Sequence, residues 1–182
     1  MLVSEIMLQQ TQVDRVVPKY REFLRRYPTI GTLARAPVNE VRRLWYPLGY
    51  NIRPVRLHMI ARETVARYHG RLPDDAAALR ALPGVGRYTA GAVLAFAHGR
   101  DAAILDTNVR RVLGRVFLGP RVAARVRGEK AYWDLAQALV PPGRAYDFNQ
   151  ALMDFGAIWC SPRRPRCAPC PMKAFCKSVD AS

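Results

Sequence analysis

Cysteine and long apolar runs are missing from most of this chain. The first 159 of its 182 residues contain no cysteine. No apolar run approaches the ~18 residues that a membrane-spanning helix needs. The opening residues, MLVSEIML, are too short for a signal peptide and include the charged Glu5. We therefore expect no membrane partner and a location in the reducing cytoplasm.

Acidic residues are also scarce. The chain has 14 Asp and Glu against 29 Lys and Arg, which gives a net charge of +15 and a pI near 10.5. Most of the basic residues are arginine, whose planar guanidinium group suits phosphate. This balance favours a polyanion partner, above all nucleic acid. A genome that simply prefers arginine, or a basic protein of the ribosomal type, would give the same charge.

Strand signals are few, whereas helical periodicity recurs along the whole chain. We expect helices over 2–14, 18–26, 37–46 and 52–68, and about ten short helices in all. The 52–68 segment has one apolar face, formed by Leu57, Ile60, Ala61, Thr64, Val65 and Tyr68. No internal repeat or low-complexity linker is present. The fold class predicted from the pattern is all-α.

The four cysteines are confined to the last 23 residues, with the spacing Cys160-x6-Cys167-x2-Cys170-x5-Cys176. In a reducing compartment, clustered cysteines are more often metal ligands than disulfides. Four thiolates suit zinc, but structural zinc usually pairs its cysteines as two short-spaced knuckles. The spacing therefore predicts one metal site.

Residues 74–99 predict two helices joined by a tight turn. Pro83 blocks continuation of the first helix, and Gly84 and Gly86, on either side of Val85, permit backbone conformations that other residues resist. The N–H groups at the start of the second helix point outward and suit a phosphate. A plain helical corner that needs Pro and Gly is the alternative.

Two acidic residues are candidates for chemistry. Glu5 lies among apolar residues of a predicted helix, where burial would raise its pKa. Asp106 precedes the basic segment 107–117, and taken alone it is better explained as a helix N-cap. Two carboxyl groups in different environments can divide the cleavage of a glycosidic bond between an acid and a stabiliser. The sequence alone does not show that they converge.

Six motifs occur in a familiar order: SEIMLQQTQV, LGY at 48–50, LPGVGRYTAGAV, ILDTNVRRVLGRV, FNQALMDFGA and the cysteine quartet. With them the chain resembles the helix-hairpin-helix DNA glycosylase superfamily, which includes endonuclease III, and it is most similar to the MutY branch of adenine glycosylases. The resemblance implies a two-lobed helical DNA glycosylase fold. It implies a six-helix domain at 1–100, with the hairpin at 74–99, and an iron–sulfur domain at 101–182, with the cluster loop at 160–176.

The resemblance also implies a reaction and its partners. A 4Fe-4S cluster would be held by Cys160, Cys167, Cys170 and Cys176, which is the expected thiolate chemistry. The partner would be double-stranded DNA with a mismatched or damaged base pair, bound by a monomer that is cytoplasmic and nucleoid-associated. Adenine opposite 8-oxoguanine or guanine would be removed by hydrolysis, with Glu5 as the acid and Asp106 as the stabiliser.

Further site residues follow from the same resemblance. Endonuclease III carries its Schiff-base lysine where this chain has Tyr88, and a phenol forms no imine, so we expect monofunctional chemistry. Gln150 would hydrogen-bond the flipped adenine, and Tyr50 would lie near 8-oxoguanine. The remaining implied DNA contacts are the wedge Gln9, Gln10 and Thr11, the hairpin residues Gly84, Val85 and Gly86, and the loop arginines Arg163, Arg164 and Arg166.

Two alternatives stay open. A thymine/uracil–G mismatch glycosylase of the same superfamily shares Tyr88, and a non-catalytic helix-hairpin-helix module would share the DNA-binding features. The chain also departs from the MutY pattern. It has Pro47 and Asn51 in the usual Gly-Leu-Gly-Tyr-Tyr segment, and it lacks the family's further C-terminal domain and about one helix before Ser4. We interpret this as a late assigned start or a truncated form.

Overall fold

The computed structural model describes residues 1–49 and 52–179, and these residues form helices and loops without a strand. The predicted all-α class is therefore confirmed. The chain divides into two compact units, 1–93 and 94–182. The domain limits of 1–100 and 101–182 stay a prediction. Among the described helices, none combines the length and the apolar character needed to cross a membrane.

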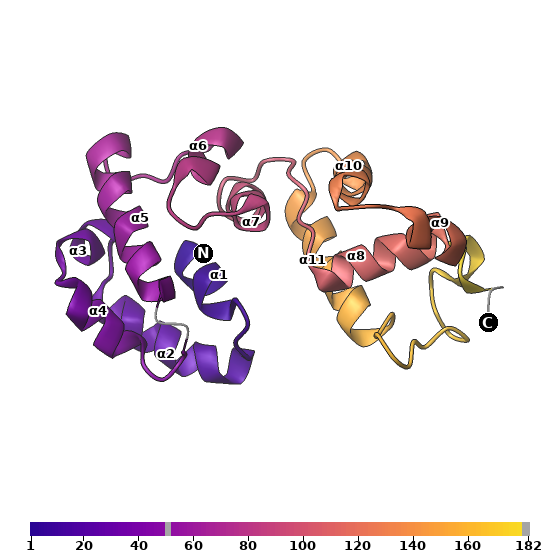
Figure 1. Ribbon diagram of the computed structural model, residues 1–182, viewed down its shortest axis with the longest axis horizontal. Coiled ribbons are helices and arrows are strands. Elements are labelled where there is room, and N and C mark those ends of the chain that lie inside the picture. Colours follow the sequence, from indigo (N-terminus) through magenta and orange to yellow (C-terminus); the bar gives the residue numbers. More distant parts are fainter. Residues whose placement is uncertain (50–51, 180–182) are drawn as a thin grey trace. The chain divides into compact units, whose positions relative to one another are not determined.

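The first unit is built around its longest helix, which contacts α1, α3 and α4 (Figure 1). Its helices are α1 (Leu2–Leu8), α2 (Val13–Arg26), α3 (Ile30–Arg35), α4 (Val38–Trp45), α5 (Ile52–Tyr68), α6 (Ala76–Ala81) and α7 (Arg87–Ala97), the last of which runs on past the division. The core is apolar and aromatic: Phe23 packs edge-on against Trp45 with ring centroids 6.1 Å apart, and Leu57 of α5 is buried. The apolar face predicted for 52–68 thus faces the core, except for Val65, which is exposed.

The single helix predicted over 2–14 is wrong, because the chain leaves the helix after Leu8 and resumes it at Val13. Gln10, in the break, adopts a left-handed backbone with φ 56°. The second helix starts at Val13, earlier than the predicted residue 18, so Pro18 lies inside it. A proline inside a helix removes one N–H and crowds the carbonyl group four residues earlier. Burial of Val16 and Phe23 on the inner face of α2 offsets this cost.

The predicted helical hairpin is present as α6, a turn and α7. Asp75 caps α6 by accepting a hydrogen bond from the Ala78 N–H at 2.9 Å. Gly84 in the turn has φ 78°, and a β-carbon built on it would lie 2.5 Å from Cδ of Arg56. Glycine is therefore favoured here by its left-handed backbone conformation, and the Arg56 side chain of α5 lies in the space that a β-carbon would take.

The second unit is centred on α8 (Thr107–Leu113), which contacts α11 (Ala145–Ile158) and α10 (Lys130–Leu139) (Figure 1). A π-helical turn, η1 (Gly114–Leu118), continues α8 and leads to α9 (Pro120–Arg125), and a short 3₁₀ helix, η2 (Lys173–Phe175), lies in the cysteine loop. Gly156 of α11 allows the closest approach to α8, since a β-carbon there would lie 2.8 Å from Cβ of Asn108. Val116 and Cys160 belong to the apolar cluster beneath this contact.

Candidate functional site

Glu5 projects from α1 and is paired with a residue of α7. Burial raises the pKa of the Glu5 carboxyl group, while a hydrogen bond with the Tyr88 side chain and the charge of the Met1 amino group oppose part of this rise. Its neighbours Ile6 and Met7 are in the core, which explains the loss of solvent around it. The result is a half-buried carboxyl group that keeps its proton to a higher pH than an exposed glutamate, as a general acid requires.

A buried arginine of α5 fixes the break between α1 and α2. Arg53 is only 4% exposed and donates to six acceptors on three segments. These acceptors are the carbonyl groups of Ile6 (3.1 Å), Met7 (2.9 Å), Gln9, Leu48 (2.9 Å) and Gly49 (3.3 Å), and the hydroxyl of Thr11 (3.0 Å). Since helix ends leave carbonyl groups without partners, the guanidinium group both caps α1 and binds the loop before α5.

Sequence reasoning missed Arg53, although a signal was present. Position 53 lies four residues before Leu57, on the same face of the helix as the predicted apolar stripe. A charged residue on such a face must be hydrogen-bonded when it is buried. The partners include Gln9 and Thr11, so the predicted wedge is held by a residue that the motif comparison did not single out.

Asp106 is the N-cap of α8, as the simpler interpretation of the sequence predicted. One carboxylate oxygen accepts from the Val109 N–H at 2.6 Å, and the other accepts from the side-chain amide of Asn108 at 3.1 Å. The Asn108 amide oxygen in turn accepts from Arg111 at 2.8 Å. The carboxylate is thus held on both oxygens by its own helix and remains partly exposed. Glu5 belongs to the first unit and Asp106 to the second, so their convergence stays a prediction.

The extended segment before Asp106 is fastened to α11 by Asn149. The buried Asn149 amide accepts from the Ile104 N–H at 3.3 Å and donates to the Ala102 carbonyl at 2.8 Å. Gln150, the residue predicted to contact the flipped base, is the next residue along α11 and is partly buried. Sequence reasoning selected Gln150 and missed its neighbour, whose role depends on a backbone segment far away in the chain.

Two arginines of the predicted basic helix hold the start of the cysteine loop. Arg111 donates to the carbonyl groups of Cys160 and Gly156, both at 2.7 Å. Arg115 donates to the carbonyl groups of Ser161 at 2.8 Å and Pro162 at 2.9 Å, and its Nη1 lies 3.5 Å from Sγ of Cys160. These guanidinium groups are therefore engaged within the protein.

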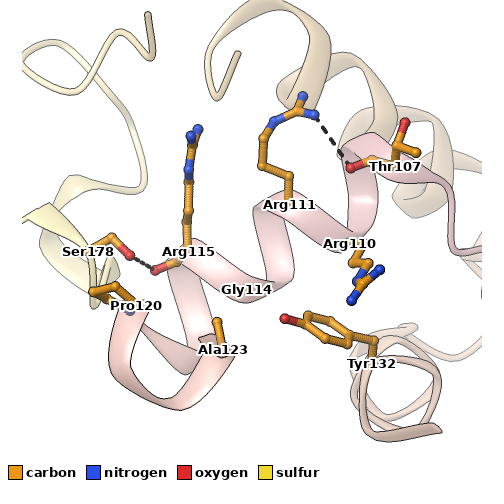
Figure 2. Close-up of a pocket in the computed structure, with 9 residues that line it drawn as sticks. All are labelled: Thr107, Arg110, Arg111, Gly114, Arg115, Pro120, Ala123, Tyr132 and Ser178. Atoms are coloured by element: carbon orange, nitrogen blue, oxygen red, sulfur yellow. Dashed lines mark hydrogen bonds between the residues drawn. The ribbon is translucent and has the colours of Figure 1, made fainter. Parts of the chain in front are cut away.

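The same helix borders an open pocket of about 530 Å³, drawn in Figure 2. Its lining residues are Thr107, Arg110, Arg111, Gly114, Arg115, Pro120, Ala123, Tyr132 and Ser178. Arg110 differs from its two neighbours because its guanidinium group lies 5.0 Å from the centre of the Tyr132 ring, a cation–π contact. No predicted site residue lines this pocket, and two of its three arginines hold the cysteine loop.

The four cysteines line one cavity of about 200 Å³, together with Val116, Phe155 and Trp159. Within the described residues, no three His, Cys, Asp or Glu side chains converge closely enough for a single metal ion. Thiolates on one zinc ion would lie about 4 Å apart, given Zn–S bonds of about 2.3 Å in a tetrahedron. All four cysteines therefore border one cavity, and thiol groups are the donors that zinc and iron–sulfur groups take.

The other predicted contacts differ in exposure. Gln10, Gly84 and Gly86 are exposed, whereas Gln9 and Thr11 are partly buried. Val85 is buried, and its N–H donates within the turn to the Leu82 carbonyl at 3.1 Å. The loop arginines Arg163, Arg164 and Arg166 are exposed. Tyr50 lies outside the described residues.

Comparison with known proteins gives a consistent family. A family model described as HhH-GPD superfamily base excision DNA repair protein matches residues 3–137. An adenine DNA glycosylase of Homo sapiens is 45% identical over 97% of this chain and 32% of its own length. The chain thus spans about a third of that relative.

Two further relatives cover most of their own length. A thymine/uracil-DNA glycosylase of Pyrobaculum aerophilum is 40% identical over 94% of this chain and 76% of that protein. The solved structure of a thermostable thymine-DNA glycosylase matches with a TM-score of 0.92 and 37% identity, and it covers 100% of this chain and 83% of that one.

Proposed function

Because this chain belongs to the HhH-GPD superfamily of base excision DNA repair proteins, we propose that it is a monofunctional DNA glycosylase that removes adenine mispaired with 8-oxoguanine or guanine. The observation that carries the proposal is the Glu5 carboxyl group, whose pKa burial raises beside Tyr88. The 45% identity with an adenine DNA glycosylase supports the choice of base. The bound form would be double-stranded DNA with the target nucleotide flipped out of the stack.

Glu5 acts as the general acid in this proposal. In its protonated form it donates a proton to N7 of the flipped adenine, which makes the base a better leaving group. Tyr88 orients the carboxyl group through their hydrogen bond and lines the pocket beside the nucleotide. Because Tyr88 has no amine, it forms no Schiff base with the sugar, and the strand stays intact.

Asp106 stabilises the sugar cation that forms as the glycosidic bond breaks. Its contacts with Val109 and Asn108 fix the direction of the carboxylate, so little reorganisation accompanies the development of charge. Water then adds to the sugar and leaves an abasic site. Glu5 and Asp106 keep separate roles because their surroundings differ, as in other pairs of catalytic carboxyl groups.

DNA recognition is proposed for the wedge, for two side chains near the target pair, for the hairpin turn and for the cysteine loop. Gln10, between Gln9 and Thr11, would enter the stack where the base leaves, Gln150 would bond the adenine edge, and Tyr50 would contact the opposite base. The turn Gly84–Gly86 and the loop arginines Arg163, Arg164 and Arg166 would contact phosphates. We keep the domain limits at 1–100 and 101–182 and the monomeric state within this proposal.

We propose a 4Fe-4S cluster on Cys160, Cys167, Cys170 and Cys176, since thiolates are its usual ligands and all four cysteines line one cavity. When bound, the cluster would cross-link the loop 160–176 and hold its arginines in place. Iron and sulfide analysis of the purified chain, with its visible absorption spectrum, tests this. A colourless protein that contains one zinc ion would contradict it.

A thymine/uracil–G mismatch glycosylase is the second candidate, favoured by the 37% identity and TM-score of 0.92 to a thymine-DNA glycosylase. One assay separates the candidates: the purified chain is incubated with duplexes that hold A:8-oxoG, A:G, T:G or U:G, and strands are analysed before and after alkali. We expect alkali-dependent cleavage at A:8-oxoG and A:G. Cleavage before alkali contradicts the monofunctional chemistry, and cleavage at T:G or U:G alone favours the second candidate. No cleavage of any duplex favours a non-catalytic DNA-binding module.

A further inference from the structure

The outer face of α4 carries basic and aromatic side chains that none of the predicted contacts includes. Asn39, Arg42, Arg43 and Tyr46, here called the α4 patch, line an open hollow of about 670 Å³. The opposite face of the helix is buried through Val41 and Trp45. The core contacts of α4 therefore fix the direction in which the patch faces.

The chemistry of the α4 patch suits a nucleic-acid strand. Tyr46 is 76% exposed, which is unusual for so large an apolar ring, and Arg42 and Arg43 are exposed beside it. Glu40, the acidic residue of α4, is paired with Arg26 at 3.1 Å, so its charge is already opposed. Guanidinium groups next to an aromatic face recur where proteins track a phosphate backbone.

The backbone that follows Tyr46 is fixed to the predicted wedge. Arg15 donates to the Pro47 carbonyl at 2.9 Å. Arg53 binds the carbonyl groups of Leu48 and Gly49 and, from the same guanidinium group, that of Gln9. The segment after Tyr46 and the wedge are therefore held together by the same arginine. A DNA strand bound at the α4 patch would have a fixed position relative to the wedge.

We propose that the α4 patch is a second DNA contact, which binds the backbone of the duplex that flanks the mismatch. Arg42 and Arg43 bind phosphates, and the Tyr46 ring packs against a deoxyribose. This inference rests on the proposed function for its choice of polyanion. It adds a site that positions the duplex on one side of the lesion without reading its sequence.

The first test is the salt dependence of duplex binding by the full chain. Each phosphate contact contributes about 0.9 to the slope of log K against log salt. The double variant Arg42→Ala/Arg43→Ala should therefore lower the slope by about 1.8. Between 50 and 200 mM salt, wild type should lose roughly tenfold more affinity than this variant. The matched control is Arg21→Ala/Arg25→Ala on the exposed face of α2, which removes the same charge.

The second test shortens the DNA. Two duplexes are used, each shortened close to the mismatch on one side only. When the flank that the α4 patch contacts is missing, the Arg42→Ala/Arg43→Ala variant and wild type should bind equally. When the other flank is missing, the variant should still bind more weakly. Tyr46→Ala should weaken binding without changing the salt slope, and Tyr46→Phe should bind like wild type. The thermal midpoints of all these variants should match wild type, since the side chains are exposed.

An unchanged slope in the Arg42/Arg43 variant, or an equal loss in the Arg21/Arg25 control, would overturn the proposal. An effect that persists whichever flank is shortened would overturn it too. Excision by wild type is read separately, so the two proposals fail in different ways. If wild type excises adenine but the Arg42/Arg43 variant has the wild-type salt slope, the proposed function stands and the proposed DNA contact is wrong. If the variant has the lower slope but wild type excises no base, the DNA contact stands and the proposed function is wrong.

Discussion

The side chain of Tyr88, near the start of α7, is hydrogen-bonded to the Glu5 carboxyl group of α1. Two effects on the pKa of Glu5 oppose each other at this contact. Burial raises the pKa because the charged form loses water, and the phenol lowers it because it donates to the charged form. Burial is the larger effect, so the carboxyl group keeps its proton to higher pH than usual. The hairpin that was predicted to bind DNA thus also affects the pKa of Glu5, through Tyr88.

Replacing Tyr88 with Phe should raise the pKa of Glu5 further. The ring would keep its packing, but the donor that favours the ionised carboxylate would be lost. The alkaline limb of the single-turnover excision rate against pH should then move upward, and no strand cleavage should appear. Tyr68→Phe on α5 is the control and should leave the profile unchanged. A limb that moves downward would show that the phenol does not favour the ionised form.

Glu5→Gln should lose excision and gain stability at neutral pH. Below the ordinary glutamate pKa of 4.5 the side chain is protonated in both the folded and the unfolded chain, so it contributes no pH dependence. Between 4.5 and the raised pKa of the folded chain, the folded chain binds more protons, and the free energy of unfolding falls as pH rises. Above the pKa that Glu5 has in the folded chain, the free energy of unfolding falls no further. The Glu5→Gln variant does not lose this stability, because glutamine does not ionise.

Thermal unfolding of wild type and Glu5→Gln across this pH range measures the effect. The midpoint of the variant should exceed that of wild type at pH 7, and the difference should vanish as the pH falls to the ordinary glutamate pKa of 4.5. The excision rate should fall by about 10²- to 10⁴-fold, the usual contribution of general acid catalysis. Glu63→Gln on α5 serves as the control. Wild type that is more stable than the variant at pH 7 would contradict the raised pKa.

Asp106→Asn should abolish excision and leave duplex binding and folding intact. Asparagine is as good an N-cap as aspartate, so its oxygen can still accept from the Val109 N–H that now lies 2.6 Å away. What is lost is the negative charge beside the sugar cation. Asp75→Asn, at the N-cap of α6, is a matched control that should excise normally. Retained excision by the Asp106 variant would remove this residue from the mechanism.

Features set by local patterns could be predicted from the sequence. The hairpin followed from Pro83 and Gly84, because a proline and a left-handed glycine leave few other conformations. The capping role of Asp106 followed from its place before a helical segment. The core face of α5 followed from its period, with Leu57, Ile60 and Ala61 all buried.

Features that depend on distant partners were not predictable in the same way. Periodicity gave one helix over 2–14, whereas the chain breaks at Gln10 where Arg53, far away in sequence, binds the surrounding carbonyl groups. Arg111 and Arg115 belong to a basic segment of the kind that often faces DNA. In the structure, however, Arg111 binds the Cys160 carbonyl group and Arg115 binds that of Ser161. A charge in the sequence does not show whether its partner is a phosphate or a carbonyl group of the same protein.

Gly156→Ala should impair excision more than folding. The new β-carbon would lie 2.8 Å from Cβ of Asn108 and 3.2 Å from its backbone carbonyl, so α8 must shift and Asn108 with it. Asn108 holds Asp106, and a small displacement of a catalytic group lowers the rate strongly. Overpacking costs about 1–3 kcal/mol, partly offset by about 1 kcal/mol of helix propensity. Thermal unfolding and single-turnover excision measure both, with the exposed Ala157→Ser as control. Full activity would show that Asn108 does not position Asp106.

Arg53→Lys tests whether the wedge depends on the hydrogen bonds of the guanidinium group or only on its positive charge. Lysine keeps the charge but has a single ammonium group, which cannot reach acceptors on both sides as the guanidinium fork does. We expect a loss of about 1–3 kcal/mol of stability from unpaired buried carbonyl groups, and a loose Gln9–Thr11 turn. The flipping step should therefore slow, whereas the alkaline limb set by Glu5 should stay where it is.

The measurement is the fluorescence change of a 2-aminopurine placed beside the mismatch, followed with the excision rate as a function of pH. Arg62→Lys, exposed on the same helix, is the control and should behave as wild type. If Arg53→Lys is destabilised but flips the base at the wild-type rate, Arg53 only supports the fold. If flipping slows while the pH limb is fixed, Arg53 positions the wedge through its contacts with Gln9 and Thr11. Its contacts with the Ile6 and Met7 carbonyl groups of α1 then do not set the pKa of Glu5.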